Sequence, residues 1–176
     1  MLKKINITNI TMIILALFLA IVLGITIYMS IPYQPQTYTI QEATELFENN
    51  RPLFHSTVNA ILTNQSIWEE YVLNDDTQSI HINSPKDNST LDRYFPKNQE
   101  IIKTFFTRTH PYSIHITNNQ QITFIFLGKQ QIWLEPQQII SYIYSYDQSF
   151  SDIKNNPNFV TQLDDNWFLL DSYNAH

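Results

Sequence analysis

Two serine–histidine pairs recur in the second half of the chain, within Ser79-Ile-His-Ile82 and Ser113-Ile-His-Ile116. Each stretch alternates polar and apolar residues, which is typical of a β-strand with its isoleucines toward a core and its polar side chains on the other face. If the two strands are neighbours, His81 and His115 face each other at about 5 Å and could share a metal ion. No third ligand follows from a recognisable spacing, so two ordinary histidines on a solvated strand face are the alternative.

Tyr142, Tyr144 and Tyr146 share one face of another expected strand. Such an aromatic ladder could bind a glycan or a peptide, since each tyrosine offers an apolar ring and a polar tip. The neighbouring segment 122–127 is apolar on both faces, however, and this favours a central strand that is covered on both sides. We therefore expect the tyrosines to pack in the core, with ligand binding as the alternative.

Composition excludes several kinds of site. The chain has no cysteine, so it has no thiol nucleophile, thiolate metal site, disulfide or lipid-modified cysteine. Gly128 is the only glycine after residue 24, so neither a Gly-rich phosphate loop nor a nucleophile elbow can be built there. No spacing selects a Ser-His-Asp triad, and the paired aspartates do not match a calcium loop. We expect no cofactor.

Helices are expected to lead into the strands that carry these residues. Thr39 and Glu42 match a capping box, in which each residue hydrogen-bonds the backbone of the other. Apolar residues continue at helical spacing after it, but Pro52 interrupts them. The sequence predicts two helices, over 40–49 and 52–72, or one helix kinked at Asn50.

The second half of the chain changes to the period of a β-sheet. A helix over 97–107 separates a first strand from four later ones. The expected strands cover 79–83, 112–117, 122–127, 138–146 and 166–171. This order predicts an α+β domain in which helices cover one face of an antiparallel sheet.

An almost unbroken apolar run over residues 12–31 precedes this domain. It is close to the ~20 residues that a helix needs to cross the hydrocarbon core of a bilayer. Lys3 and Lys4 precede the run and no Lys or Arg follows it before Arg51, which predicts a cytoplasmic N-terminus. A cleaved signal peptide is the alternative, but the flanking residues lack the small side chains of a cleavage site.

These signals divide the chain into four expected regions. They are a cytoplasmic N-terminus (1–11), a transmembrane signal anchor (12–31), a Pro-containing stalk (32–38) and an extracytoplasmic α+β domain (39–176). Within the anchor, Ala16, Ala20 and Gly24 recur every four residues and line one helix face with small side chains. Because such a stripe lets two transmembrane helices approach closely, we expect that the anchor can form a homodimer.

The net charge of the chain limits the classes of molecule that it is expected to bind. The formal net charge is −6, and without Lys3 and Lys4 eight basic residues face sixteen acidic ones. This balance disfavours nucleic acid and anionic lipid headgroups, which both attract basic surfaces. A small extracytoplasmic domain without disulfides is typical of a bacterial envelope, which predicts a single-pass protein of the cytoplasmic membrane.

The order of elements over 39–172 is similar to that of the nuclear-transport-factor-2-like and cystatin-like cones, in which helices pack into a curved sheet. In addition, Tyr142-Ile-Tyr-Ser145 and Asp165-Asn-Trp-Phe168 resemble the closing strand pair of small bacterial envelope domains of unknown function. Neither resemblance includes a functional motif, so neither implies an activity.

The sequence therefore favours a membrane-anchored binding protein that is not an enzyme and that binds a protein or a cell-wall ligand. An immunity or inhibitor protein fits this description, because such proteins are small, acidic, anchored and free of catalytic motifs. One alternative is an extracytoplasmic hydrolase with a pocket in the curved sheet and His81 or His115 as its base. The other alternative is a structural accessory of an envelope complex that is assembled through the anchor.

Overall fold

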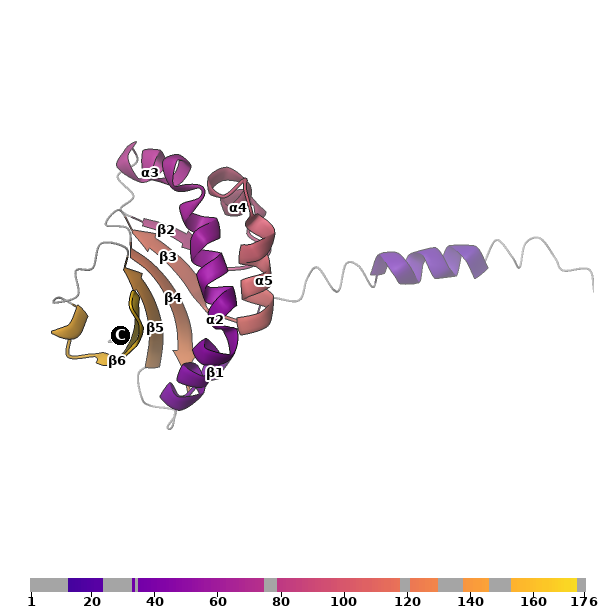
Figure 1. Cartoon of the computed structure of the whole chain (residues 1–176). Helices are drawn as coiled ribbons and strands as arrows, with labels where there is room; N and C mark the ends of the chain where they lie inside the picture. The colour runs from indigo at the N-terminus through magenta and orange to yellow at the C-terminus, as the bar shows by residue number, and fades with distance from the viewer. Residues whose placement is uncertain are drawn as a thin grey trace, which may run out of the picture. The chain divides into compact units, whose positions relative to one another are not determined.

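The computed structural model describes residues 13–23, 33, 35–74, 79–117, 121–129, 138–145 and 153–173. The chain divides into two compact units, residues 1–33 and 34–176. In the first unit, residues 13–23 form a helix with exposed side chains (Figure 1). Across the described ranges, no helix is both long and apolar enough to cross a bilayer. The expected cytoplasmic segment and the remainder of the expected anchor lie outside these ranges.

Helix α2 (Ile40–Leu62) begins at the expected capping box. The Thr39 hydroxyl accepts a hydrogen bond from the Glu42 amide at 3.2 Å, and the Glu42 carboxylate accepts one from the Thr39 amide at 2.8 Å. The helix continues through Pro52 with a kink at Asn50, where φ is −122° and ψ is 15°. A proline inside a helix removes one backbone hydrogen bond and crowds the preceding turn, which explains the kink. The kinked alternative is confirmed.

Helix α2 ends ten residues before the predicted boundary, and helix α3 (Gln65–Asn74) follows it. Asn64 is fully buried at the corner between them, and its side-chain amide donates to the carbonyl of Ala60 at 2.8 Å. The Trp68 indole N–H donates to the Ile61 carbonyl at 3.1 Å. Both bonds satisfy carbonyls in the last turn of α2, which helix ends leave unpaired.

The second unit contains a seven-stranded sheet in the order β2-β3-β4-β5-β7-β6, with β1 attached to β4. All neighbours are antiparallel except β1 and β4. The expected α+β class with an antiparallel sheet is confirmed. The strands are β1 (Thr37–Tyr38), β2 (Ser79–Ile82), β3 (Ser113–Thr117), β4 (Gln121–Gly128), β5 (Gln138–Ser145), β6 (Phe159–Asp164) and β7 (Trp167–Tyr173).

Strand β1 shows that the folded unit begins before residue 39. Thr37 and Tyr38, which belong to the expected stalk, pair with the last two residues of β4. The Tyr38 hydroxyl also donates to the Thr109 carbonyl at 2.8 Å.

Gly128, at the end of β4, is required by close packing, because a Cβ there would lie 2.5 Å from side-chain atoms of Gln138.

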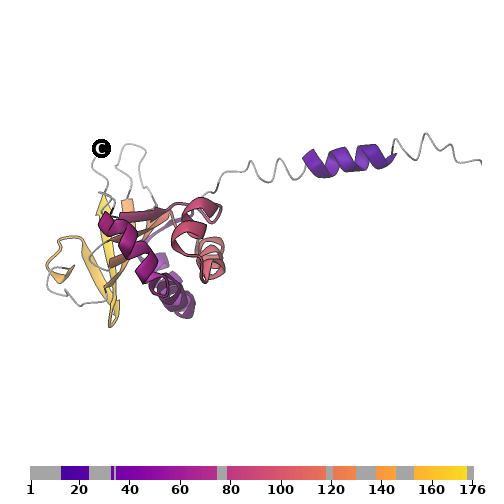
Figure 2. The same ribbon diagram turned by 90° about the horizontal axis from the view of Figure 1, so that it is seen from above.

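Helices α2 and α5 (Gln99–Thr109) pack side by side on one face of the sheet (Figures 1 and 2). Phe54 of α2 lies at the centre of the core, with ring centroids 4.9 Å from Phe105 and 5.6 Å from Phe124. The largest core side chains here are fully buried, namely Phe47, Phe54, Phe105, Phe124, Phe126, Tyr142 and Trp167. Aromatic rings therefore fill the space between these helices and the sheet.

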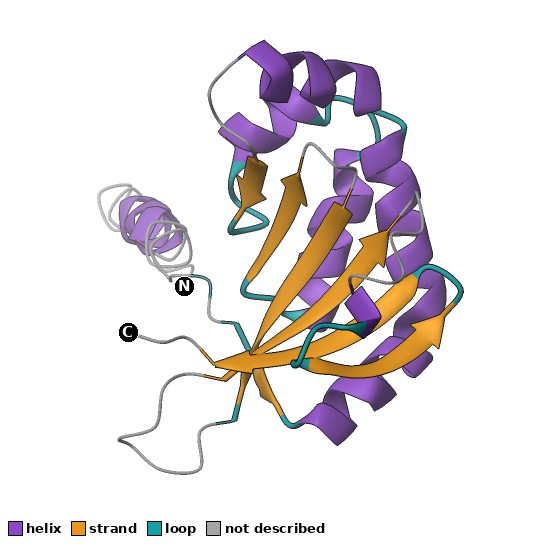
Figure 3. Ribbon diagram, turned by 90° about the vertical axis from the view of Figure 1, so that its left-hand side faces the viewer, coloured by secondary structure: helices purple, strands orange, loops and turns teal. Residues whose placement is uncertain are grey.

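The other face of the sheet turns away from these helices (Figure 3). Part of it is covered by a small apolar cluster, in which Ile153, Phe168 and Leu170 are buried and Ile143 and Phe159 pack against them. At the opposite end of the same face, strands β2 and β3 present serine, histidine and threonine side chains. The two histidines of the sequence motif therefore belong to the face that α2 and α5 do not cover.

Besides β1, two further elements lie where the sequence predicts none. Helix α4 (Asn88–Tyr94) begins at Asp87, whose carboxylate accepts a hydrogen bond from the Thr90 amide at 3.2 Å. Strand β6 pairs with β7 through two register shifts. The polar composition of α4 and the irregular register of β6 obscure the periods by which helices and strands are recognised.

Candidate functional site

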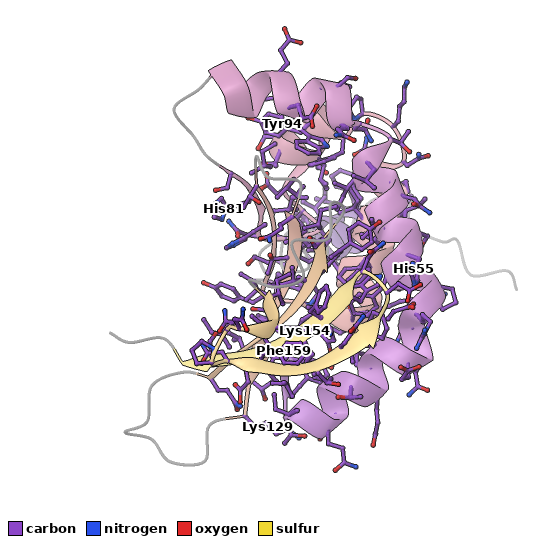
Figure 4. The ribbon with its side chains drawn as sticks, turned by 60° about the vertical axis from the view of Figure 1, so that its left-hand side comes forward. His55, His81, Tyr94, Lys129, Lys154 and Phe159 are labelled. Carbon is purple, nitrogen blue, oxygen red and sulfur yellow. The ribbon has the colours of Figure 1, made fainter. Side chains whose placement is uncertain are left out.

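His81 and His115 lie directly opposite each other on neighbouring antiparallel strands, as the alternation of the two motifs predicts. Their ring centroids are 4.0 Å apart, with the ring planes inclined by 60°. His81 is exposed and points away from the body of the domain (Figure 4), whereas His115 is half-buried. The isoleucines on either side of each histidine are buried on the opposite face.

Each histidine contacts the serine of its own motif. The Ser79 hydroxyl lies 2.8 Å from His81 Nε2, and the Ser113 hydroxyl lies 3.0 Å from His115 Nε2. Each serine precedes its histidine by two residues, and the strands run in opposite directions. The two serines therefore lie at opposite ends of the histidine pair, and the two Nε2 atoms diverge.

Burial and the neighbouring ring both affect the pKa of His115. Partial burial, and secondarily the proximity of His81, lower the pKa of His115 to about 4. Burial disfavours the charged form of a histidine, and a second histidine adds repulsion whenever both are protonated. His115 is therefore neutral at pH 7 and available for hydrogen bonding to Ser113.

A zinc site built on the Nε2 atoms of both histidines would require another arrangement of the two rings. A tetrahedral zinc ion requires ligand atoms that converge at about 2.0–2.1 Å from the metal. The Nε2 atoms diverge here, and each already contacts a hydroxyl. Within the described part of the chain, no group of three His, Cys, Asp or Glu side chains could hold a metal ion.

The tyrosine ladder is divided between the core and its margin. Tyr142 is fully buried, and its hydroxyl donates to the Ala43 carbonyl of α2 at 2.6 Å. Burial, with a smaller contribution from Tyr38, raises the pKa of Tyr142. Tyr144 is half-buried with its ring 5.3 Å from that of Trp167, and Tyr146 lies outside the described residues. Tyr142 is thus a core residue that is inaccessible to a ligand.

A charged cluster joins α2 to the turn between β6 and β7. Arg51 contacts Asp164 at 3.0 Å and Glu48 at 2.8 Å, and His55 Nε2 lies 3.3 Å from the same Asp164 oxygen. A hydrogen bond from the Asp165 amide, together with Arg51 and His55, lowers the pKa of Asp164. Helical spacing alone indicates that Glu48, Arg51 and His55 are neighbours on α2. No sequence signal connects them to Asp164.

An open depression lies beside β1 and the first turns of α2. Its volume is about 370 Å³, and Tyr38, Glu42 and Glu45 contribute to its polar lining. Hydrogen bonds from Lys129, and then from Thr39, lower the pKa of Glu42 to about 2. The Glu42 carboxylate in this depression is therefore already paired with the Lys129 ammonium group.

The small-residue face of the anchor is described only in part. Ala16 and Ala20 lie on the exposed helix over 13–23, four residues apart. Gly24, the third residue of this expected face, lies outside the described residues.

The strongest candidate for chemistry is therefore the histidine pair, while the charged cluster connects two elements of the fold. Comparisons of the chain with protein-family models, with curated proteins and with solved structures find no match.

Proposed function

We propose that this chain is a non-catalytic binding protein of the bacterial envelope, anchored in the cytoplasmic membrane by residues 12–31. The observation that carries the proposal is the apolar character of this run. In its described part, the large hydrophobic side chains are 43–63% exposed. A helix that exposes apolar side chains on all sides requires lipid or protein around it, and the length of the run in the sequence suits lipid.

The flanking charges support an orientation with the second unit outside the cytoplasm. Lys3 and Lys4 precede the run, and the next basic residue is Arg51. Alkaline phosphatase fused after His176 should be active and green fluorescent protein at the same position should be dark, because each reports the compartment of the fusion point. The mature protein should also retain Met1 or begin close to it. A mature N-terminus beyond Ser30 would refute the anchor.

Two features of the second unit support binding rather than catalysis. Among the described residues, the face of the sheet toward α2 and α5 is packed with buried aromatic rings, which favours a solid core there over the pocket of the hydrolase hypothesis. On the other face, the described contacts of the histidine pair are with Ser79, with Ser113 and between the two rings, and the Nε2 atoms diverge. A protein or cell-wall partner is the ligand class proposed, and an immunity or inhibitor protein fits the size, acidity and anchoring.

Photo-crosslinking in intact cells tests the binding proposal. A photoreactive phenylalanine analogue replaces one exposed residue at a time, His81 on the open sheet face and Thr107 on α5. A binding surface should give discrete adducts from one of these positions and not from the other, since a specific interface occupies a limited patch. Equal, diffuse labelling from both positions would contradict a specific partner.

The hydrolase alternative is supported by one specific observation, the 2.8 Å separation of the Ser79 hydroxyl from His81 Nε2. A serine beside a histidine base is the arrangement that activates a nucleophile. A fluorophosphonate probe, which reacts with activated serines, distinguishes the two functions. We expect no labelling of the full-length protein. Labelling that Ser79→Ala abolishes would replace the binding proposal with the hydrolase.

A further inference from the structure

Charge is unevenly distributed in the second unit. Of the eight Lys and Arg residues after Tyr33, five lie within residues 86–108, together with three of the sixteen acidic residues. This segment therefore carries a net charge of +2, whereas the remainder of the unit has three basic and thirteen acidic residues and a net charge of −10. The acidity of the whole chain conceals a basic region.

The basic region corresponds to helices α4 and α5 and the residues that flank them, which lie next to each other in the fold (Figure 1). Most of its basic side chains are exposed, namely Lys86, Arg93, Lys97 and Arg108. Lys103 is more covered and contacts Glu100 at 3.0 Å. We call the exposed side chains of residues 86–108 the α4–α5 surface.

Two of the three acidic residues in this region already serve local structure. The Asp87 carboxylate caps α4, and Glu100 pairs with Lys103. Other acidic side chains are exposed elsewhere, such as Glu45 and Glu48 on α2 and Asp165 between β6 and β7. An anionic surface would thus attract the α4–α5 surface and repel these other parts of the unit.

We propose that the α4–α5 surface rests on anionic lipid headgroups of the membrane that holds the anchor, and thereby orients the domain. The proposal rests on the proposed anchoring and adds a second contact with the same membrane. Each Lys or Arg near an anionic surface favours contact by roughly fivefold. The tether supplies a high effective concentration, so a few such residues suffice to bias the orientation.

This orientation would leave the histidine pair accessible. His81 belongs to the sheet face that α2 and α5 do not cover (Figure 4), whereas α4 and α5 lie on the helical side of the sheet (Figure 1). A domain that rests on its helical layer presents its open sheet face away from the lipid. The basic surface would therefore select which face meets a partner.

Energy transfer from the domain to the lipid surface tests the orientation. The full-length protein is placed in lipid nanodiscs that contain either phosphatidylcholine alone or phosphatidylcholine with phosphatidylglycerol, with an acceptor dye on the lipid headgroups. Because the chain has no cysteine, a donor dye can be attached at one introduced cysteine. Thr107→Cys places it on the α4–α5 surface, and Asn155→Cys places it on an exposed residue before β6.

We expect phosphatidylglycerol to raise transfer from the Thr107 position at least twofold and to leave transfer from the Asn155 position unchanged or lower. Salt at ~1 M should remove the effect, because the Debye length then shrinks to about 3 Å. Lys97→Glu and Arg108→Glu should each reduce the increase. Lys154→Glu is the matched control, since it changes the net charge equally but lies outside the α4–α5 surface.

The outcomes separate this inference from the proposed anchoring. Protein that fails to copurify with nanodiscs of either composition would refute the anchor itself. Copurification with equal transfer in both lipid mixtures would refute only the orientation. An equal loss of transfer in Lys154→Glu would also overturn the inference, because it would show that net charge alone, and not the α4–α5 surface, sets the contact. Circular dichroism of each variant verifies that its fold is retained.

Discussion

The side-chain amide of Asn64 pairs with the backbone of Lys97 in both directions. Its Nδ2 donates to the Lys97 carbonyl at 2.8 Å, and its Oδ1 accepts a hydrogen bond from the Lys97 amide at 3.2 Å. Asn64 is fully buried between α2 and α3, while Lys97 precedes α5. A single side chain thus satisfies backbone groups from segments that are 33 residues apart.

Asn64→Ala should lower the free energy of unfolding by about 2–3 kcal/mol, because it removes both hydrogen bonds to the partly buried backbone amide and carbonyl of Lys97. Urea denaturation followed by circular dichroism measures the loss. Asn59→Ala is the control, since Asn59 lies on the same helix with an exposed side chain and should change stability by less than about 0.5 kcal/mol. Equal effects of the two substitutions would show that the pairing with Lys97 contributes nothing.

Trp68 and Trp167 are both fully buried, but their indole N–H groups differ. The N–H of Trp68 donates to the Ile61 carbonyl at 3.1 Å, whereas that of Trp167 is buried and has no hydrogen-bond partner among the residues that the structure describes. Trp68→Phe should therefore destabilise the domain by about 1 kcal/mol more than Trp167→Phe, because it alone removes a hydrogen bond. Thermal and urea unfolding of the two variants give the difference. The opposite order would show that ring volume outweighs the hydrogen bond.

The sequence predicts elements whose signals are local. The capping box at Thr39 and the alternation around His81 and His115 depend on residues a few positions apart, and both features occur as expected. The kink of α2 follows from Pro52, because no proline can continue the hydrogen-bond ladder of a helix. The pairing of β2 with β3 required only that two similar strands become neighbours.

Other features depend on partners far along the chain and have no local signal. The end of α2 is one of them, because the apolar spacing continues past it and Lys97, the partner of Asn64, is remote. The contact of Arg51 with Asp164 spans 113 residues and joins a helix to a turn. The sequence does not predict β6, because its two register shifts break the alternation that identifies a strand.

The depressed pKa of His115 predicts a loss of stability in acid. The unfolded chain binds a proton at His115 as the pH falls through about 6.5, while the folded protein resists it until about 4. Stability should fall as the pH decreases across this window and level off below it. Allowing for solvent screening of a half-buried group, we expect the free energy of unfolding to fall by about 1–2 kcal/mol across this window. Urea titrations at pH 7, 5.5 and 4 measure this pH dependence, which His115→Gln should reduce. If the free energy of unfolding of His115→Gln falls with pH as steeply as that of the unmodified protein, the prediction is contradicted.

The expected dimer of the anchor depends on close approach of two helix backbones at Ala16, Ala20 and Gly24. Gly24→Ile should abolish self-association of the isolated segment in a membrane two-hybrid assay, because the added side chain blocks that approach. Val22→Ile, a substitution that falls between positions of the small-residue stripe, is the matched control and should retain association. If the unmodified, Gly24→Ile and Val22→Ile segments associate equally, the small-residue stripe is not a dimer interface. The hypothesis of a structural accessory assembled through the anchor would then be weakened.

The histidine pair gives the sharpest contrast between a binding protein and a metal enzyme. Because the two Nε2 atoms diverge and each contacts a serine, we expect zinc to leave the melting temperature of the protein within about 1 °C of its metal-free value, since little metal binding means little stabilisation by linkage. His81→Ala and His115→Ala should both fold, as neither side chain belongs to the aromatic core. Differential scanning fluorimetry with zinc and with a chelator measures the shift. A rise of several degrees that His115→Ala abolishes would show that the rings rotate to bind metal, and would favour the enzyme.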